Sequence, residues 1–356
     1  QERGLSGTCR TNARAFTAAI ETLDAETQQA LIDLYKIQAG EIATRIRNHS
    51  GPDDNLALQE LQQLLGQVQG ILQRLTTERD ALLNEALAKA ADYGARPVLG
   101  SVMDTGAVVA TAASMRVSQD ALRFMQTFIA EDGLQLADRI WRIDRGARDK
   151  IVNALESAII QGHGAGQAAR EFLAQGAAVP ADVANKLTAA NASALSKTAQ
   201  EIMAGTGSPM DNAMRLMRTE INRAHGEAYM MGGEDHPDFG GWRFLLSPAH
   251  PKPDICDLLS TQNLYGLGPG VYPDRERLPW PPHPNTLSFV EIVFKDEITA
   301  EAKAGKETPL EALARLAPER REGVLGKGKA EIYDAGKLTQ GMIRAPLATV
   351  AKRIAS

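Results

Sequence analysis

Aromatic side chains make up only 5% of this 356-residue chain, and just two cysteines occur, Cys9 and Cys256. Two cysteines exclude the disulfide framework that holds small secreted domains together. One bridge between them is an alternative, but we expect both to be reduced thiols in a protein made in the cytoplasm. No apolar run reaches the ~18–20 residues that a membrane-spanning helix requires. The opening segment QERGLSGTCR lacks the apolar core of a signal peptide. We therefore expect no membrane partner.

Ala and Leu, by contrast, are abundant, within a composition that is 44% hydrophobic and 23% charged. These values are ordinary for a soluble globular protein, and the Ala and Leu content favours helices that pack through aliphatic side chains. The chain is long enough to bury a sizeable core and to form two or three domains.

Charge is distributed unevenly along the chain. The formal net charge of −5 argues against a protein that coats nucleic acid over its whole surface. From Glu301 to Ser356, however, 11 Lys and Arg face 7 Asp and Glu. A basic tail on an acidic body can contact a phosphate backbone locally, and the alternative is a solvated helical tail. The candidate DNA-contacting residues are Arg320, Arg321, Lys327, Lys329 and Lys337.

Residues 1–131 have the pattern of a long-helix region. Apolar residues from Ile20 to Ile46 fall largely at helical spacing, and the segment 48–55, NHSGPDDN, then interrupts them. A clearer stripe at i, i+3, i+4 and i+7 follows, formed by Leu61, Leu64, Leu65, Val68, Ile71, Leu72 and Leu75. The two segments predict an antiparallel helical hairpin. We expect a second break over 92–101, DYGARPVLGS, and another helix over 107–130.

Residues 132–298 have the pattern of a mixed α+β core. Helices are predicted over 134–160 and 181–204. A further helix is predicted to begin with Ser208 as N-cap and Pro209 in its first turn.

Two strands are expected late in this core, WRFLLSP at 242–248 and LSFVEIVFKDE at 287–297. They are predicted to pair around a long loop rich in Pro and Gly, and a loop of that length needs internal support. The tail, 299–356, is predicted to form short helices. The predicted fold class is therefore α+β and mostly α, with a small antiparallel sheet.

The long loop holds the residue types that bind metals. His250, Cys256 and His283 lie in it, with Asp254 and Asp257 nearby, and zinc prefers thiolate, imidazole and carboxylate ligands. The paired spacing Cys-x-x-Cys is absent, which weakens this interpretation. The alternative, which we favour, is that His250, Asp254, Cys256 and His283 brace the loop without metal. No cofactor is then expected.

Covalent catalysis is a further interpretation of the same residues. Cys256 with either histidine contains the elements of a thiolate pair, but nothing in PDICDLL orients it. The Gly-rich segments GHGAG and GLGPG are not phosphate-binding loops, because no Lys-Ser/Thr follows them. We therefore assign no catalytic residue and expect the protein not to be an enzyme.

The segment 215–225, RLMRTEINRAH, predicts a helix with a polar strip beside apolar residues. Its charged residues are suited to an internal ion-pair network rather than an active site. We predict that Arg218, Thr219 and Glu220 help to anchor this helix to the long loop, and that Trp242 packs the first strand.

Three segments in this order resemble one family: the helix AMRLMRTEINRAHGEAY, the strand GWRFLLSP and the closing segment LPWPPHPNTLSFVEIVF. They are similar to the phage Mu F-like head morphogenesis proteins, the minor head proteins of tailed phages. The matching positions are Arg218, Thr219, Glu220, Trp242, His283 and Pro284. Many members follow His-Pro with a Cys-rich pair of positions, whereas this chain has Thr286 and Ser288 in that region.

The resemblance implies a minor capsid protein inside the virion head, near the portal vertex. Its expected partner is the portal protein, and contacts with major capsid or scaffold protein and with packaged double-stranded DNA are left open. The expected roles are head assembly, DNA packaging or genome ejection. The tail is too short for the toxin domains of some relatives.

Two other functions are considered beside this one. One is a metal-assisted hydrolase that uses the 250–283 loop, and the other is a helical adaptor from a bacterial system unrelated to phage.

Overall fold

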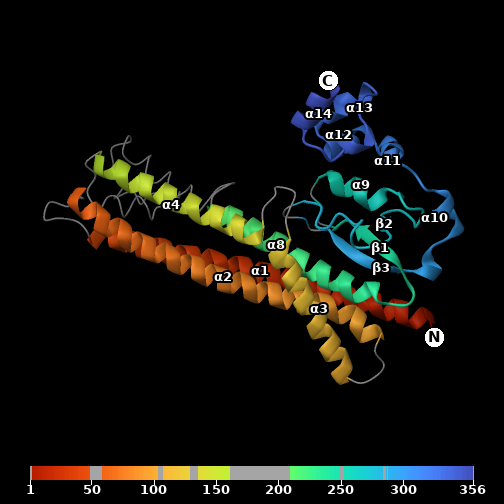
Figure 1. Ribbon diagram of the computed structural model, residues 1–356, viewed down its shortest axis with the longest axis horizontal. Coiled ribbons are helices and arrows are strands. Elements are labelled where there is room, and N and C mark those ends of the chain that lie inside the picture. The colour runs from red at the N-terminus through yellow and green to blue at the C-terminus, as the bar shows by residue number, and fades with distance from the viewer. Residues whose placement is uncertain are drawn as a thin grey trace. The chain divides into compact units, whose positions relative to one another are not determined.

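The computed structural model describes residues 2–48, 58–102, 107–128, 135–160 and 209–355, apart from positions 249, 251, 284, 285 and 287. The described segments are mostly helical and contain a small three-stranded antiparallel sheet (Figure 1), which confirms the predicted class. The long helices are α1 (Glu2–Asn48), α2 (Leu58–Val102), α3 (Ala107–Thr127), α4 (Leu136–Ile160) and α8 (Pro209–Glu234). Among these described helices, none is both long and apolar enough to cross a membrane.

The remaining elements are short and follow α8. The strands are β1 (Phe239–Leu245), β2 (Val271–Tyr272) and β3 (Phe289–Phe294). The helices are α9 (Ile255–Thr261), α10 (Ala300–Ala304), α11 (Pro309–Arg315), α12 (Pro318–Leu325), α13 (Lys327–Asp334) and α14 (Leu347–Ala355), with 3-10 turns η1 (Lys295–Glu297) and η2 (Gln340–Met342).

The chain divides into two compact units that interleave in sequence. The first, which we call the helical unit, comprises Glu21–Ala88 and Arg123–Ile221. The second, which we call the sheet unit, comprises Gln1–Ile20, Lys89–Leu122 and Asn222–Ser356. The boundaries expected from the sequence, 131/132 and 298/299, cut the chain into contiguous pieces. The interleaving arises because long helices such as α8 contribute residues to both units.

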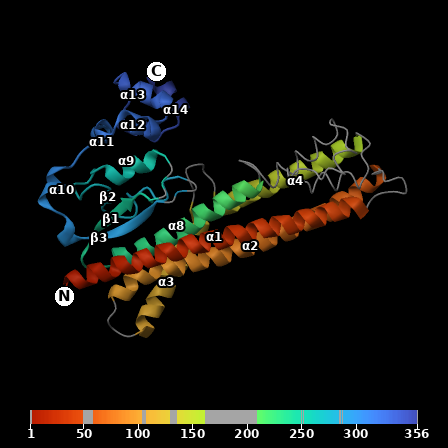
Figure 2. The same cartoon turned by 180° about the vertical axis from the view of Figure 1, so that it is seen from behind.

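The helical unit contains the predicted antiparallel hairpin of α1 and α2, which lie side by side in Figures 1 and 2. The Gln38 amide of α1 donates to Glu78 of α2 at 3.3 Å, and Glu41 of α1 pairs with Arg74 of α2 at 2.6 Å. A later residue of α1 thus contacts an earlier residue of α2, so the two helices run antiparallel. The apolar stripe faces inward, because Leu64, Val68, Ile71 and Leu75 are all buried. The hairpin prediction is therefore confirmed.

The predicted break at 92–101 is wrong, because α2 continues through this segment to Val102 with Pro97 inside it. Proline inside a helix removes one backbone hydrogen bond and crowds the carbonyl four residues earlier, so packing has to compensate for Pro97. Gly94 is a packing position rather than a helix terminator. A Cβ at Gly94 would overlap with the carbonyl oxygen of His225 on α8, so the missing side chain permits a close approach of two helices.

The sheet has the order β2–β1–β3, and both pairings are antiparallel. β1 and β3 pair as the sequence predicts, with Trp242 opposite Ile292. The short β2 was not anticipated, because two residues carry no strand pattern of their own. Trp242 and Phe244 are fully buried and belong to a core with Tyr229 and Met230 of α8. The sheet is thus held against the second half of α8.

The tail forms short helices that share a core, which agrees with the sequence prediction. Thr308 and Glu311 form a capping box at the start of α11. Leu313 of α11, Leu325 of α12 and Val350 of α14 are buried in one apolar cluster that also includes Leu258 of α9. The tail is therefore packed on the loop that precedes it. The predicted helix over 181–204 and the predicted N-cap Ser208 lie outside the described residues.

Candidate functional site

The long loop between β1 and β3 is fixed to the second half of α8. The Asn222 side chain donates to the Thr286 carbonyl at 3.1 Å, and Arg275 donates to the Glu227 carboxylate at 2.9 Å. The Tyr229 hydroxyl accepts from the Ile292 backbone amide at 3.3 Å. Burial raises the pKa of the Glu227 carboxyl, and its pairing with Arg275 opposes that rise. Helix, loop and last strand therefore form one bonded module.

Arg218, Thr219 and Glu220 belong to the helical unit instead. Arg218 pairs with Asp24 of α1 at 2.8 Å, and Glu220 pairs with Arg139 of α4 at 3.0 Å. The Thr219 hydroxyl donates to the carbonyl of Arg215, one turn earlier on the same helix. Among the described residues, Arg218 and Glu220 thus pair with α1 and α4, and the described contacts between α8 and the loop come one to three turns later.

The residues that do hold the loop have only a weak signal in the sequence. Asn222, Gly226 and Tyr229 recur at i, i+4 and i+7, so they share one side of α8. Gly226 permits contact with Trp280, since a Cβ there would overlap with the indole nitrogen. Gly226 inside a helix is the sequence signal for this contact, but its partner Trp280 lies more than fifty residues later in the chain.

Four of the predicted loop-bracing residues lie together around the start of α9. Asp254 is the N-cap, and its carboxylate accepts from the Cys256 amide at 2.7 Å. Asp257 accepts from the Asp254 amide at 2.9 Å, which completes a reciprocal cap. Nε2 of His250 lies 3.0 Å from the Asp257 carboxylate. His283, at the far end of the loop, reaches the same cap.

One thiol and one carboxylate lie beside the same ring nitrogen of His283. Its Nε2 lies 3.1 Å from Sγ of Cys256 and 3.3 Å from Oδ2 of Asp254. The hydroxyl oxygen of Thr286 lies 4.0 Å from the same sulfur. A catalytic thiol–imidazole–carboxylate set uses both ring nitrogens, one for the nucleophile and one for the orienting acid. This arrangement has a different geometry, because both groups meet the same nitrogen.

Burial and charge further define this cluster, which we call the Cys-His-Asp cluster (Asp254, Cys256 and His283). Cys256 is fully buried, while the Asp254 and His283 side chains are about one-third exposed. Burial alone would raise the pKa of Asp254, but hydrogen bonds from His283 and the Cys256 amide outweigh it and lower this pKa to about 2. The carboxylate is therefore ionised at neutral pH. Because Cys256 is fully buried, its sulfur is poorly placed to attack a bulky substrate.

Trp242 lies in the sheet core rather than in this cluster. It is fully buried, its ring centroid lies 5.2 Å from that of Tyr229, and its indole nitrogen donates to Glu234 at 3.3 Å. Its place agrees with the packing role expected for it.

Two of the five candidate DNA-contacting residues are engaged within the tail. Arg321 donates to the carbonyls of Leu313 and Leu316 at the end of α11, and its guanidinium lies over the ring of Tyr333. Lys329 donates to the carbonyls of Ile343 and Ala345, and burial lowers the pKa of its amine. Both residues hold the tail fold together, so their side chains are less available for DNA than those of the other three candidates. Arg320, Lys327 and Lys337 are exposed.

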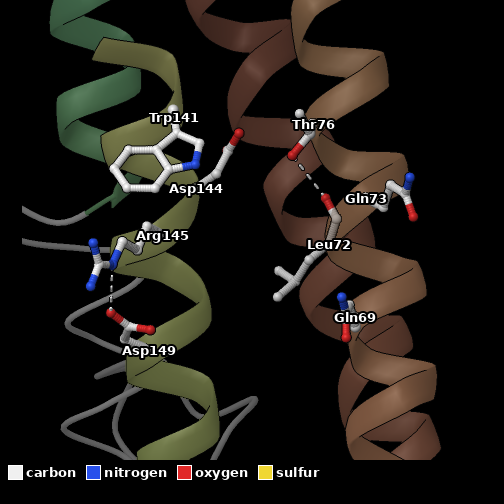
Figure 3. Close-up of a pocket in the computed structure, with 8 residues that line it drawn as sticks. All are labelled: Gln69, Leu72, Gln73, Thr76, Trp141, Asp144, Arg145 and Asp149. Carbon is white, nitrogen blue, oxygen red and sulfur yellow. Dashed lines mark hydrogen bonds and ion pairs between the residues drawn. The ribbon is translucent and has the colours of Figure 1, made fainter. Parts of the chain in front are cut away.

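A hollow of about 720 Å³ lies between α2 and α4 of the helical unit. Figure 3 shows the residues that line it: Gln69, Leu72, Gln73 and Thr76 of α2, and Trp141, Asp144, Arg145 and Asp149 of α4. Trp141 is 59% exposed, with the Arg145 guanidinium 5.3 Å from its ring. Sequence reasoning did not anticipate this feature, because each of its two walls comes from a different helix.

No protein-family model matches this chain, and no curated protein or solved structure matches it either. The fold and the site therefore define its class: a mostly helical α+β protein in which a loop module with a Cys-His-Asp cluster is fixed to one long helix.

Proposed function

We propose that this chain is a minor head protein of a tailed phage, which docks at the portal inside the head and supports head assembly, DNA packaging or genome ejection. The proposal starts from the resemblance in the sequence: an Arg-Thr-Glu helix, a Trp-led strand and a loop that ends in His-Pro before a last strand. Its expected location is the virion interior near the portal vertex, after synthesis in the host cytoplasm.

One observation carries the proposal: the segments that bear the resemblance pack together. Tyr229 of α8 contacts Trp242 of β1 and accepts a hydrogen bond from Ile292 of β3. Three stretches separated in the sequence thus share one core, as a rigid docking module would require. The single-nitrogen geometry at His283 supports a structural role for the loop over covalent catalysis by Cys256.

Exposed apolar side chains on the helices support a protein that binds partners. Ile37 of α1, Met115 of α3, Trp141 of α4 and Leu347 of α14 are 66%, 63%, 59% and 47% exposed. Tryptophan is among the side chains that dominate binding energy at protein–protein interfaces, so Trp141 is the strongest candidate contact of the four. The portal protein is the proposed partner, and major capsid or scaffold protein and packaged DNA are secondary ones.

Two measurements test this function. The full chain is co-expressed with the portal protein encoded in the same genome, and we expect the two to co-purify as a stable complex. Replacing Met115, Trp141 or Leu347 by Ser one at a time identifies the docking helix, and Gln73→Ser serves as a polar control. Purified virions are then examined for the chain by mass spectrometry. A chain that is absent from virions and does not bind the portal would contradict the proposal and favour the unrelated adaptor.

A further inference from the structure

We propose that Cys256, His283 and Asp254 bind one zinc-class divalent cation, which ties the start of α9 to the end of the long loop. The three ligand atoms lie within 4.8 Å of one another. Thiolate, imidazole and carboxylate together are a ligand set that zinc prefers, and a sulfur ligand argues against magnesium or calcium. This site is independent of the proposed role at the portal.

The interatomic distances fit a common metal. Zinc bonds of ~2.3 Å to sulfur and ~2.0–2.2 Å to nitrogen and oxygen place tetrahedral ligands ~3.3–3.6 Å apart. Nε2 of His283 lies 3.3 Å from Oδ2 of Asp254 and 3.1 Å from Sγ of Cys256. Small adjustments of the His283 ring bring both separations to these values, and the third pair, Cys256 Sγ with a carboxylate oxygen of Asp254, lies within 4.8 Å. The partial exposure of Asp254 and His283 leaves room for a water molecule as fourth ligand.

Two groups of this cluster share one nitrogen of His283. Nε2 of an imidazole carries at most one proton, and here the Cys256 sulfur and the Asp254 carboxylate both lie within reach of it. A cation at their centre satisfies both at once. A thiolate and a carboxylate also balance the two positive charges of the ion, while the imidazole remains neutral.

Neighbouring groups orient the ligands as outer-shell residues do in metal sites. The second oxygen of Asp254 accepts from the Cys256 amide, and Asp257 fixes the Asp254 backbone while it contacts His250. The Thr286 hydroxyl lies close enough to the sulfur to support a thiolate. Such second-shell partners typically change metal affinity 10–100-fold when they are removed.

The proposal is tested on the full chain, purified without a histidine tag, stripped with a chelator and titrated with Zn²⁺ alone and then with Co²⁺ alone. We expect one equivalent to bind per chain, and the cobalt form to show thiolate-to-cobalt charge-transfer absorption. Cys256→Ser should abolish that absorption, and His283→Gln should weaken zinc binding at least ~100-fold. His250→Gln, in the outer shell, should weaken it ~10-fold.

Matched controls separate this cluster from the remaining thiol and histidines. Cys9→Ser should retain the charge-transfer absorption, and His236→Gln should leave zinc affinity unchanged. Circular dichroism confirms that each variant is folded. Failure of the unaltered chain to bind zinc, or binding that survives Cys256→Ser in full, would overturn the proposal whatever the variants' stability.

Discussion

The side chain of Asn222 donates a hydrogen bond to the carbonyl of Thr286 at 3.1 Å, across 64 positions of sequence. It joins α8 to the segment that leads into β3. We expect Asn222→Ala to lower the free energy of unfolding of the sheet unit by ~1 kcal/mol. Asn222→Asp should cost more, because a carboxylate would then face a carbonyl oxygen.

Unfolding of the sheet unit can be followed by fluorescence in denaturant. Trp242 and Trp280 lie in this unit and Trp141 in the other, so a Trp141→Phe background isolates the signal. An Asn222→Ala midpoint equal to that of the background protein would show that the bond contributes nothing.

Gly226 and Gly70 offer a matched pair of helical glycines. A Cβ at Gly226 would overlap with Trp280, whereas nothing lies within 4 Å of one at Gly70. We expect Gly226→Ala to destabilise the sheet unit by ~1–3 kcal/mol through overpacking. Gly70→Ala should stabilise the helical unit by ~0.5–1 kcal/mol, because alanine has the higher helix propensity. Thermal unfolding of both variants measures this, and a shift in the same direction for both would contradict the account.

His225 makes the stability of the sheet unit dependent on pH. The His225 residue is partly buried, and burial of its ring lowers its pKa to about 4 from an ordinary value of 6.5. The folded state therefore binds this proton less tightly than the unfolded state. Its contribution is complete above pH ~6.5 and is lost as the pH falls toward 4.

We expect acidification from pH 7 to 4 to remove roughly 3 kcal/mol of unfolding free energy through His225. His225→Gln cannot titrate, so the difference between the variant and the unaltered chain should shrink over this interval. Denaturant unfolding at several pH values measures it, and a difference that is constant with pH would refute the role of His225.

A buried ion pair fixes α2 to α4 within the helical unit. The side chain of Arg79 is 3% exposed and pairs with Asp144 and Asp80. Burial disfavours the charged guanidinium, but its hydrogen bonds to Asp144 prevail and raise the pKa of Arg79. We expect Asp144→Asn to cost ~3 kcal/mol, because it leaves a buried charge with fewer partners.

The matched control for this pair lies on the same helix. Asp149 pairs with Arg145 at 3.7 Å, and both side chains are more than 60% exposed. Asp149→Asn should change stability by less than ~0.5 kcal/mol. Thermal unfolding of both variants measures the two losses of stability. Equal losses for Asp144→Asn and Asp149→Asn would contradict the role of the buried pair.

The exposed tail residues Arg320, Lys327 and Lys337 are the proposed DNA contacts. Replacing all three by Ala should weaken binding to double-stranded DNA and reduce the salt dependence by about one unit of slope per lost phosphate contact. Point variants are preferable to removal of 299–356, because that segment shares an apolar core with Leu258.

A control with the same charge change replaces Lys36, Arg142 and Lys252, which are exposed and lie outside the tail. Titration with a DNA duplex at several salt concentrations compares the two triple variants. Equal effects in both would mean that net charge, and not the tail, determines binding.

Periodic and local features were predictable from the sequence. The stripe from Leu61 to Leu75 predicted the hairpin, because a repeat of 3.6 residues places those side chains on one face that must be buried. The strands around Trp242 and Val290 were recognisable by their β-forming residues, and the presence of Pro209 marked the start of α8. Each of these signals depends on neighbours within a few residues.

Tertiary structure decided the features that depend on distant partners. Gly94 and Pro97 have the pattern of a break, yet close packing on α8 retains the helix. Arg218 and Glu220 could have faced the loop or other helices, and their partners Asp24 and Arg139 are visible only once the helices are packed. The meeting of Cys256 with His283 likewise depends on the path of the whole loop. The sequence by itself determined the hairpin helices, the start of α8 and the strands β1 and β3, because those signals are local. Packing determined which side chains meet, because the energy of a contact depends on both of its partners.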